Sequence, residues 1–326
     1  MTLCEFLNQA HVRVKMAGFR PKMPRVIDAP LQVTPRSERY ALIGTAFDYL
    51  LRFEIKRRVP HAVERRWVAS TVADGICQIP KEELRRFCAL RTDFQLDELK
   101  YDSNEEVDRE IRGARTVRTH LEDPCEIYYF RAVREVVNKA EDDIAAYRAN
   151  RRPSIGEQKQ AAYQALRLAK IDAVKRAAKV DATFEQVDRD DIEELVELLG
   201  IVPWNELLFW EPIILNPTLG SINLRIGTDA DLICGDCLID IKTTKKRSME
   251  QEWLDQLLVY FLLSRLGCGT EKSVPRLERF GFYFARHGLL WQQHAQEWTD
   301  QPAFAELERW IVDQLMGARL GASADR

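Results

Sequence analysis

Three aspartates and one lysine of the chain share a spacing that could bring them together. Asp229, Asp231, Asp240 and Lys242 lie in two apolar stretches that flank a glycine-aspartate pair at 235–236. Glycine in the first position favours a two-residue type II′ turn, so the two stretches are predicted to pair as an antiparallel hairpin. That turn places Asp231 opposite Asp240 and Asp229 opposite Lys242. Because side chains alternate between faces along a strand, all four should point the same way.

Directly opposed carboxylates repel each other across a strand pair, so this arrangement needs a compensating charge. A divalent cation bound between Asp231 and Asp240 would supply it, and carboxylate oxygens suit Mg²⁺ or Mn²⁺. Lys242 beside that cation would orient a water or steady the negative charge that develops on a phosphate. The alternative is an exposed sheet face with ordinary charges. The opposite face of the hairpin is apolar and is expected to join the core through Ile222, Leu224, Ile226, Ala230, Leu232, Ile239 and Ile241.

The last third of the chain holds the elements that must position this hairpin. Residues 207–215 and 221–244 read as strands, and residues 279–291 as a further β segment. Apolar residues at helical spacing predict helices over 249–266 and 303–320. The order of hairpin, helix, strand and helix predicts a mixed α/β fold.

The rest of the chain is expected to be mostly helical. Residues 40–58 carry an apolar stripe at helical spacing, and residues 81–200 alternate charged and apolar residues in the same way. We therefore predict three parts. Residues 1–59 form an N-terminal arm and the first core helix, residues 60–202 a mostly helical insertion, and residues 203–326 the core with the hairpin and a terminal helix.

The composition of the chain limits the classes of protein to which it can belong. The 326 residues are 46% hydrophobic and 30% charged, and no apolar run approaches the length of a membrane span. The first residues lack the layout of a signal peptide, so a cytoplasmic protein is expected. A net charge of -3 argues against a protein that coats DNA nonspecifically, but it allows a local basic groove. Of the seven cysteines, only those at 234 and 237 form a C-x-x-C, and a zinc site normally needs a second ligand pair.

The hairpin resembles the active centre of the PD-(D/E)XK nuclease superfamily. The signature of that superfamily is an aspartate on one strand, followed on the next by an acidic residue, any residue and a lysine. Asp231 matches the first position, and Asp240 and Lys242 match the second. Asp229 competes for the first position, but the hairpin register and the apolar pair at 232–233 favour Asp231. The resemblance implies a restriction-endonuclease-like mixed-sheet core flanked by helices, with a large helical insertion.

Further segments are similar to the RecB-like branch, which includes lambda exonuclease relatives and CRISPR adaptation nucleases. Gln256 and Tyr260 match its Q-x-x-x-Y motif, and a spacing of four puts both on one helical face. Asp48 stands where an early helix motif of that branch ends in a metal-binding histidine. Glu211 resembles an acidic residue often found on the preceding strand. Arg286 ends the strand expected beside the hairpin and would contact a phosphate. Each of the five also has a purely structural interpretation.

Together these features predict a metal-dependent nuclease that hydrolyses phosphodiester bonds in DNA, with RNA as the alternative substrate and with exonuclease and endonuclease action both open. One alternative is a degenerate nuclease-fold protein that binds nucleic acid or a protein partner without cutting. Another is an interaction protein that binds a partner through the helical insertion, at residues 80–200. The residues implied by role are Asp231, Asp240 and Lys242 in catalysis, Gln256, Tyr260 and Arg286 in substrate positioning, and Asp231, Asp240, Asp48 and Glu211 in binding Mg²⁺ or Mn²⁺.

Overall fold

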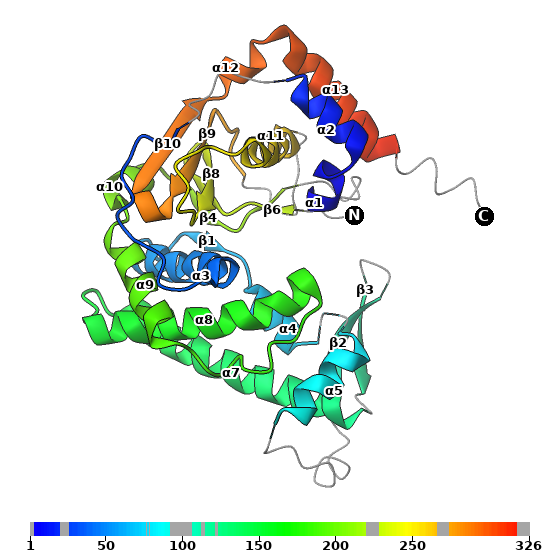
Figure 1. Ribbon diagram of the computed structural model, residues 1–326, viewed down its shortest axis with the longest axis vertical. Coiled ribbons are helices and arrows are strands. Elements are labelled where there is room, and N and C mark those ends of the chain that lie inside the picture. Colours follow the sequence, from blue (N-terminus) through cyan, green and yellow to red (C-terminus); the bar gives the residue numbers. More distant parts are fainter. Residues whose placement is uncertain are drawn as a thin grey trace, which may run out of the picture. The chain divides into compact units, whose positions relative to one another are not determined.

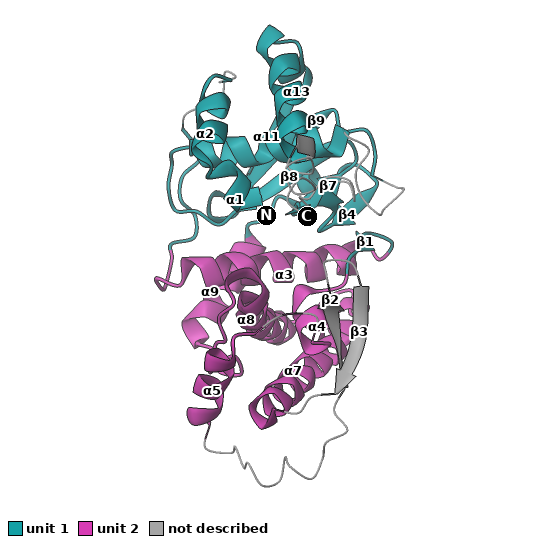
Figure 2. Cartoon of the chain, turned by 90° about the vertical axis from the view of Figure 1, so that its right-hand side faces the viewer, with its two compact units in different colours: residues 1–34, 61–65, 201–326 teal, residues 35–60, 66–200 magenta. Residues whose placement is uncertain are grey.

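The computed structural model describes residues 3–19, 26–75, 77, 79–91, 106–111, 115–120, 123–219, 228–265 and 274–317, of which 106–111, 115–120 and 316–317 are described by their backbone alone. The chain divides into two compact units (Figure 2). The sheet unit comprises residues 1–34, 61–65 and 201–326, and the helical unit comprises residues 35–60 and 66–200. The helix at 40–58, expected beside the hairpin core, therefore groups with the helical unit.

A six-stranded sheet organises the sheet unit (Figure 1). Its strands, in spatial order, are β1 (Val63–Glu64), β4 (Ile213–Leu215), β7 (Leu232–Cys234), β8 (Cys237–Lys242), β9 (Arg279–Phe284) and β10 (Leu289–His294). A separate pair is formed by β5 (Thr218–Leu219) and β6 (Thr228–Asp229). In the six-stranded sheet, β1 runs parallel to β4 and β8 parallel to β9, while the other neighbours are antiparallel. The predicted mixed α/β architecture, a sheet flanked by helices, is confirmed.

The predicted hairpin is present as β7 and β8. Leu232 pairs with Ile239, which is the register that the glycine turn predicts. Gly235 adopts a φ of 59°, the left-handed value that the first position of a type II′ turn requires. A Cβ at this position would lie 2.5 Å from the Cβ of Trp210, so glycine is needed for space as well as for conformation.

The hairpin is shorter than predicted at its open end. Asp229 does not face Lys242; it lies in β6, where its partner is Thr218 of β5. The chain bends at Asp231, before β7 begins, and this bend takes the preceding residues out of the hairpin. The predicted placement of Asp229 is therefore wrong. Three residues assigned to the apolar face, Ile222, Leu224 and Ile226, lie outside the described residues.

Two other predicted β segments differ from the structure. Residues 207–215 were expected as one strand, but they include the end of α10 (Trp204–Leu207), and only β4 is extended. Residues 279–291 form β9 and the start of β10, joined by a 3-10 turn at Ala285–His287. Gly288 follows that turn with a φ of 57°, which lets the chain reverse direction.

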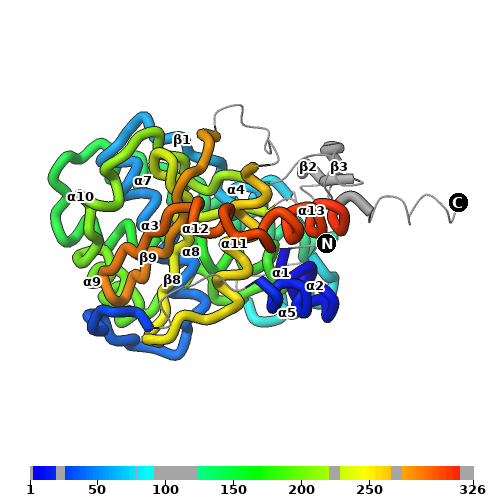
Figure 3. The backbone as a smooth tube through the Cα atoms, turned by 90° about the horizontal axis from the view of Figure 1, so that it is seen from above, coloured from blue at the N-terminus to red at the C-terminus, as the bar shows by residue number. Residues whose placement is uncertain are grey.

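The helix α11 (Gln251–Arg265) carries the chain from β8 to β9, a path that Figure 3 follows along the backbone. It shares one apolar core with α1 (Leu3–Leu7), α2 (Ala10–Ala17) and α13 (Pro302–Gly317), which lie on the same side of the sheet (Figure 1). In this core, the ring of Phe280 on β9 lies 3.7 Å from the ring of Trp298 in α12 (Gln296–Thr299), centroid to centroid. Burial of these aromatic faces stabilises the packing of helices on the sheet.

The helical unit is built around α8, which packs against α3, α4, α7 and α9. A capping box starts α8, because Ser154 and Glu157 satisfy each other's backbone N–H groups. Two strands also occur in this part of the chain, which was expected to be mostly helical. The elements are α3 (Tyr40–Arg58), α4 (Val68–Ala73), α5 (Lys81–Ala89), β2 (Glu106–Ile111), β3 (Arg115–His120), α7 (Pro124–Ala149), α8 (Ile155–Ala177) and α9 (Arg189–Gly200).

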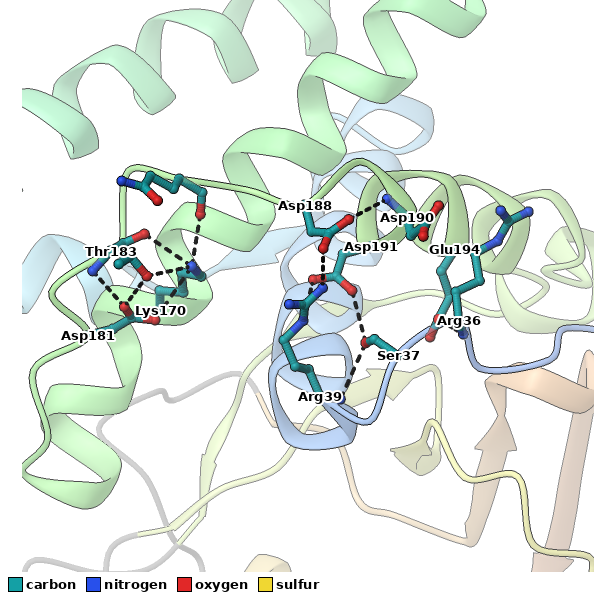
Figure 4. Close-up of polar contacts among 11 residues, drawn as sticks. Arg36, Ser37, Arg39, Lys170, Asp181, Thr183, Asp188, Asp190, Asp191 and Glu194 are labelled. Atoms are coloured by element: carbon teal, nitrogen blue, oxygen red, sulfur yellow. Dashed lines mark hydrogen bonds and ion pairs between the residues drawn. The ribbon is translucent and has the colours of Figure 1, made fainter.

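Polar contacts fasten the segment before α3 to the start of α9 (Figure 4). Arg39 forms ion pairs with Asp188 at 2.8 Å and with Asp191 at 2.9 Å. The Ser37 hydroxyl donates a hydrogen bond to Asp191, and the Arg36 backbone N–H donates one to Glu194. These acidic side chains are matched by cations and donors, so the cluster holds two helices together within the helical unit.

Candidate active site

Asp240 and Lys242 lie two residues apart on β8 and therefore share one face of that strand. β8 is an inner strand, with β7 and β9 on its two sides. Asp240 is 2% exposed, and the Nζ of Lys242 lies 2.6 Å from its Oδ2. The predicted spacing thus produces a buried ion pair at the carboxyl end of an inner strand, an edge at which ligands of α/β sheets commonly bind.

Asp231 joins this ion pair through a hydrogen bond instead of through strand pairing. Its Oδ2 accepts a hydrogen bond of 2.7 Å from the backbone N–H of Ile241. Ile241 lies between Asp240 and Lys242, so this bond holds the Asp231 carboxylate at the same end of β8. The carboxylate takes the place of a main-chain acceptor, and a backbone donor at the end of the hairpin stays satisfied.

Gln256 and Tyr260 extend the site onto α11. The Oε1 of Gln256 accepts a hydrogen bond of 3.1 Å from the Lys242 Nζ, and its Nε2 donates one of 2.7 Å to the Tyr260 hydroxyl. One turn of helix separates the two residues, as the spacing predicts. A polar chain therefore runs from the carboxylate of Asp240 through Lys242 and Gln256 to Tyr260, and each group in it is oriented by the next.

The pKa of the Tyr260 hydroxyl is affected by the charges of both carboxylates. Burial raises the pKa of Tyr260, and the charges of Asp240 and Asp231 raise it further. The phenol therefore keeps its proton at neutral pH, and it can both donate and accept a hydrogen bond. The hydrogen bond from Ile241 to Asp231 places the Asp231 carboxylate beside the residue that follows Asp240.

Asp240 carries a charge that its surroundings do not fully compensate. Burial raises the pKa of Asp240, and the attraction of Lys242 offsets only part of that effect. A cation near the carboxylate would favour its ionised form. Two neighbouring carboxylates suit Mg²⁺, which usually takes one or two of them and completes its shell with water and phosphate oxygens. In the described part of the chain, no group of three or more His, Cys, Asp or Glu side chains could hold a metal.

The structure does not bring Glu211 to these carboxylates. Glu211 precedes β4 at the end where the carbonyl of Pro212 accepts a hydrogen bond from Gly235, in the hairpin turn. Asp231 lies at the other end of β4, and the three residues of that strand span roughly 10 Å. The exposed carboxylate of Glu211 instead contacts His61 at 2.9 Å. We therefore leave Glu211 out of the ligand set.

Asp48 and Arg286 are also engaged elsewhere. Asp48 belongs to α3 of the helical unit and forms an ion pair of 2.9 Å with Arg52. Arg286 is fully buried and donates hydrogen bonds to the backbone carbonyls of Thr243 and Val33. A buried guanidinium that ties three chain segments together is not available to a phosphate, so its predicted role in positioning the substrate is not supported.

Asp229, the rival for the first carboxylate position, is exposed, and the contacts described for its carboxylate are with Thr218 and Arg65. It accepts a hydrogen bond from the Thr218 hydroxyl and lies 3.5 Å from Arg65. The register and these contacts both leave Asp231 as the aspartate held beside β8. Asp229 is thus a matched residue of the same type outside the site.

Sequence reasoning missed a pocket beside Lys242. Lys242 and Gln256 line a cavity of about 530 Å³ together with residues of α1, α2 and the first turns of α11. Trp253 is one of its walls, and its ring centroid lies 6.0 Å from the Lys242 Nζ. Trp253 stands three residues before Gln256, a spacing that puts both on one helical face and that could have drawn attention to it.

Comparisons with known proteins yield no relative of this chain: no family model, curated protein or solved structure matches it. None of the described helices is both long and apolar enough to cross a membrane.

Proposed function

We propose that this protein is a metal-dependent nuclease that hydrolyses phosphodiester bonds in DNA. The observation that carries the proposal is the convergence of three side chains at one end of β8. Asp231 is held there by the backbone N–H of Ile241, and Asp240 and Lys242 form a buried ion pair. Two carboxylates can hold a divalent cation, and a lysine beside them can act on the water or the phosphate that the cation activates.

The arrangement of strands supports a restriction-endonuclease-like core. β4, β7 and β8 run antiparallel in succession, and α11 then leads to β9, which lies parallel to β8. The proposed site lies where β8 passes toward α11. In this fold the two helical-motif residues, Gln256 and Tyr260, would flank the carboxylates. The hydrogen bond between Gln256 and Lys242 and the one between Gln256 and Tyr260 agree with that role.

Asp231 and Asp240 would hold Mg²⁺ or Mn²⁺. When bound, the ion would lower the pKa of a coordinated water and offset negative charge on the scissile phosphate. The raised pKa of Asp240 fits this role, because a buried carboxylate with incomplete compensation gains from a second positive charge. We do not include Asp48 or Glu211 in the set, given the partners that each has.

Lys242 would act on the attacking water or on the developing phosphate charge. Its ammonium group has three donors, of which one faces Asp240 and one faces Gln256. The remaining donor is available to hold a phosphate oxygen or a water. Gln256 orients the ammonium, and Tyr260 in turn fixes the amide of Gln256, so the lysine is positioned before substrate arrives.

A cleavage assay tests the proposal. Labelled DNA, single-stranded and double-stranded, linear and circular, is incubated with Mg²⁺ or Mn²⁺, and RNA is run in parallel. We expect cutting by the wild type that is lost in Asp231→Asn, Asp240→Asn and Lys242→Ala. Asp229→Asn is the matched control and should cut normally. Equal loss in the control, or cutting that survives Asp240→Asn, would overturn the assignment; the circular substrate separates endonuclease from exonuclease action.

A second candidate is a nuclease-fold protein that binds nucleic acid without cutting it. The ion pair between Asp48 and Arg52 favours it, because an aspartate engaged in this way stands where the resemblance implies a metal-binding histidine. This candidate predicts that the wild type binds labelled DNA and leaves it intact with either metal. It also predicts that Asp240→Asn binds equally well with and without Mg²⁺.

A further inference from the structure

The pocket beside Lys242 has the size and position of a binding site for part of the substrate. Its volume is about 530 Å³, within the range of roughly 300–1,000 Å³ found for small-molecule sites. The helices α1 and α2 line one side of it, and the first turns of α11 line the other. Because Lys242 and Gln256 belong both to this lining and to the proposed site, a group seated in the pocket would adjoin the reacting phosphate.

One wall of the pocket is the ring of Trp253. Trp253 is half-buried, and its ring is backed by Phe284 of β9, at 6.3 Å between centroids. The Lys242 Nζ lies 6.0 Å from the same ring. A held indole that faces a pocket next to a phosphate-binding lysine is suited to stack on a nucleobase, and a base of any sequence has such a face.

The polar lining favours a base over a phosphate in this pocket. Glu252 and Asp255 are among the lining residues, and negative side chains repel a phosphate but accept hydrogen bonds from the exocyclic amino groups of bases. Gln251 donates a hydrogen bond of 2.8 Å to Asp255, which orients that acceptor. Arg13, on α2, also lines the pocket and supplies a positive charge for a phosphate that flanks the base.

We propose that this pocket seats an unpaired base of a DNA strand, stacked on Trp253, and that the enzyme is therefore selective for single-stranded DNA. This rests on the proposed nuclease function and adds its substrate class. In a duplex the faces of the bases are stacked and their amino groups are paired, so a base can enter only after it is unstacked. The acceptors in the pocket also predict a preference for adenine, cytosine and guanine, which carry amino groups, over thymine.

The test uses the full-length protein and a single-stranded oligonucleotide that carries 2-aminopurine. Fluorescence of 2-aminopurine is followed on binding to Asp240→Asn, which separates binding from cleavage. We expect quenching that Trp253→Ala in the same background abolishes and Trp253→Phe retains, with affinity lowered roughly ten- to hundredfold in the alanine variant. Trp210→Ala, at an exposed tryptophan outside the pocket, is the matched control and should leave the quenching unchanged.

Cleavage of unmodified strands supplies a second measurement that needs no variant at Trp253. The wild type should cut oligo-dA and oligo-dC faster than oligo-dT, and single strands faster than duplex. Equal cutting of single strands and duplex, with no dependence on the base, would overturn the inference and leave the nuclease intact. Base-dependent quenching without any cutting would overturn the nuclease and keep the pocket. Stronger quenching and faster cutting with RNA than with DNA would overturn the assignment of DNA as the substrate and replace it with RNA.

Discussion

Glu54 in the helical unit and Asp240 in the sheet unit are both buried carboxylates, 3% and 2% exposed, and both contact cations. Glu54 accepts hydrogen bonds from Arg57 at 2.6 and 2.7 Å, from Arg58 at 2.7 Å and from the Tyr147 hydroxyl at 2.7 Å. Among the described residues, Lys242 is the one cation in contact with Asp240. The two units thus bury the same chemical group with very different compensation.

The pKa values of the two groups shift in opposite directions for that reason. Burial alone would raise the pKa of Glu54, but the hydrogen bonds from Arg57, Tyr147 and Arg58 outweigh it and hold the pKa below its usual value. Burial raises the pKa of Asp240, and Lys242 does not reverse this. Glu54 is complete as a structural ion cluster. Asp240 keeps a raised pKa beside its one lysine, and the proposed function assigns it a further cation.

The largest expected effect separates activity from stability at Asp240. Asp240→Asn should lower cleavage on the order of 10³-fold, the size seen when one electrostatic group of an active site is removed. It should not lower the thermal midpoint of the metal-free protein. A raised pKa means that the fold prefers the neutral carboxyl, so above that pKa the ionised group costs free energy, and asparagine removes the cost.

Activity and thermal unfolding in a chelator, measured on the same preparation, check this prediction. The amide of Gln256 still faces the Lys242 Nζ in the variant, so the lysine keeps a partner. A marked drop in the metal-free midpoint would mean that Asp240 is a structural ion-pair partner, like Glu54, and would remove the contrast between the two units.

Glu54→Gln should lower stability and leave cleavage unchanged, which is the reverse of the effect expected for Asp240→Asn. The substitution leaves Arg57, with a side chain 9% exposed, without its carboxylate, and breaking a buried pair typically costs about 3–5 kcal/mol. Urea unfolding of wild type and variant measures the loss. Glu135→Gln, at an exposed position of α7, is the matched control, with an expected change below about 0.5 kcal/mol. A loss at Glu54 no larger than at Glu135 would contradict the assigned role.

The contrast also shows what could be read from the sequence. The Gly235 turn and the alternation of β8 are local, so the register and the shared face of Asp240 and Lys242 were predictable. The contact of Gln256 with Tyr260 follows from helical spacing alone. The mixed sheet flanked by helices followed from the order of periodic segments, because period and element length are also properties of short stretches.

Long-range partners account for the rest. Asp229 leaves the hairpin because it pairs with Thr218 of β5, eleven residues away. Arg286 is buried because two distant carbonyls, at Val33 and Thr243, converge on it. The set of hydrogen-bond donors around Glu54 is completed by the hydroxyl of Tyr147, on another helix. The spacing of residues in a single sequence does not reveal such long-range contacts, and these contacts decide which charged groups are structural.

Low pH should destabilise the helical unit through protonation of Glu54. The loss of stability should be smaller than that caused by Glu54→Gln, because protonation leaves the side-chain atoms in place. The folded pKa of Glu54 is lowered from an ordinary value of 4.5, so its contribution is present above that value and is lost as the pH falls through the lower folded value. The urea midpoint should therefore fall steeply below about pH 5 in the wild type. Glu54→Gln should show a shallower slope there; parallel slopes in the two proteins would rule Glu54 out as the group responsible.

The smallest expected effect isolates one donor of the cluster. Tyr147→Phe removes only the hydroxyl that donates to Glu54, and a hydrogen bond to a charged group contributes about 1.5–3 kcal/mol. Because Arg57 and Arg58 remain, we expect a loss at the lower end of that range. Tyr163→Phe is the control, since its hydroxyl makes a longer bond of 3.3 Å to a neutral carbonyl. The variant should also move the acid transition to higher pH, because one of the groups that lowers the pKa of Glu54 is gone. If stability falls without that shift, the hydroxyl acts through packing, and the satisfied state of Glu54 rests on the two arginines alone.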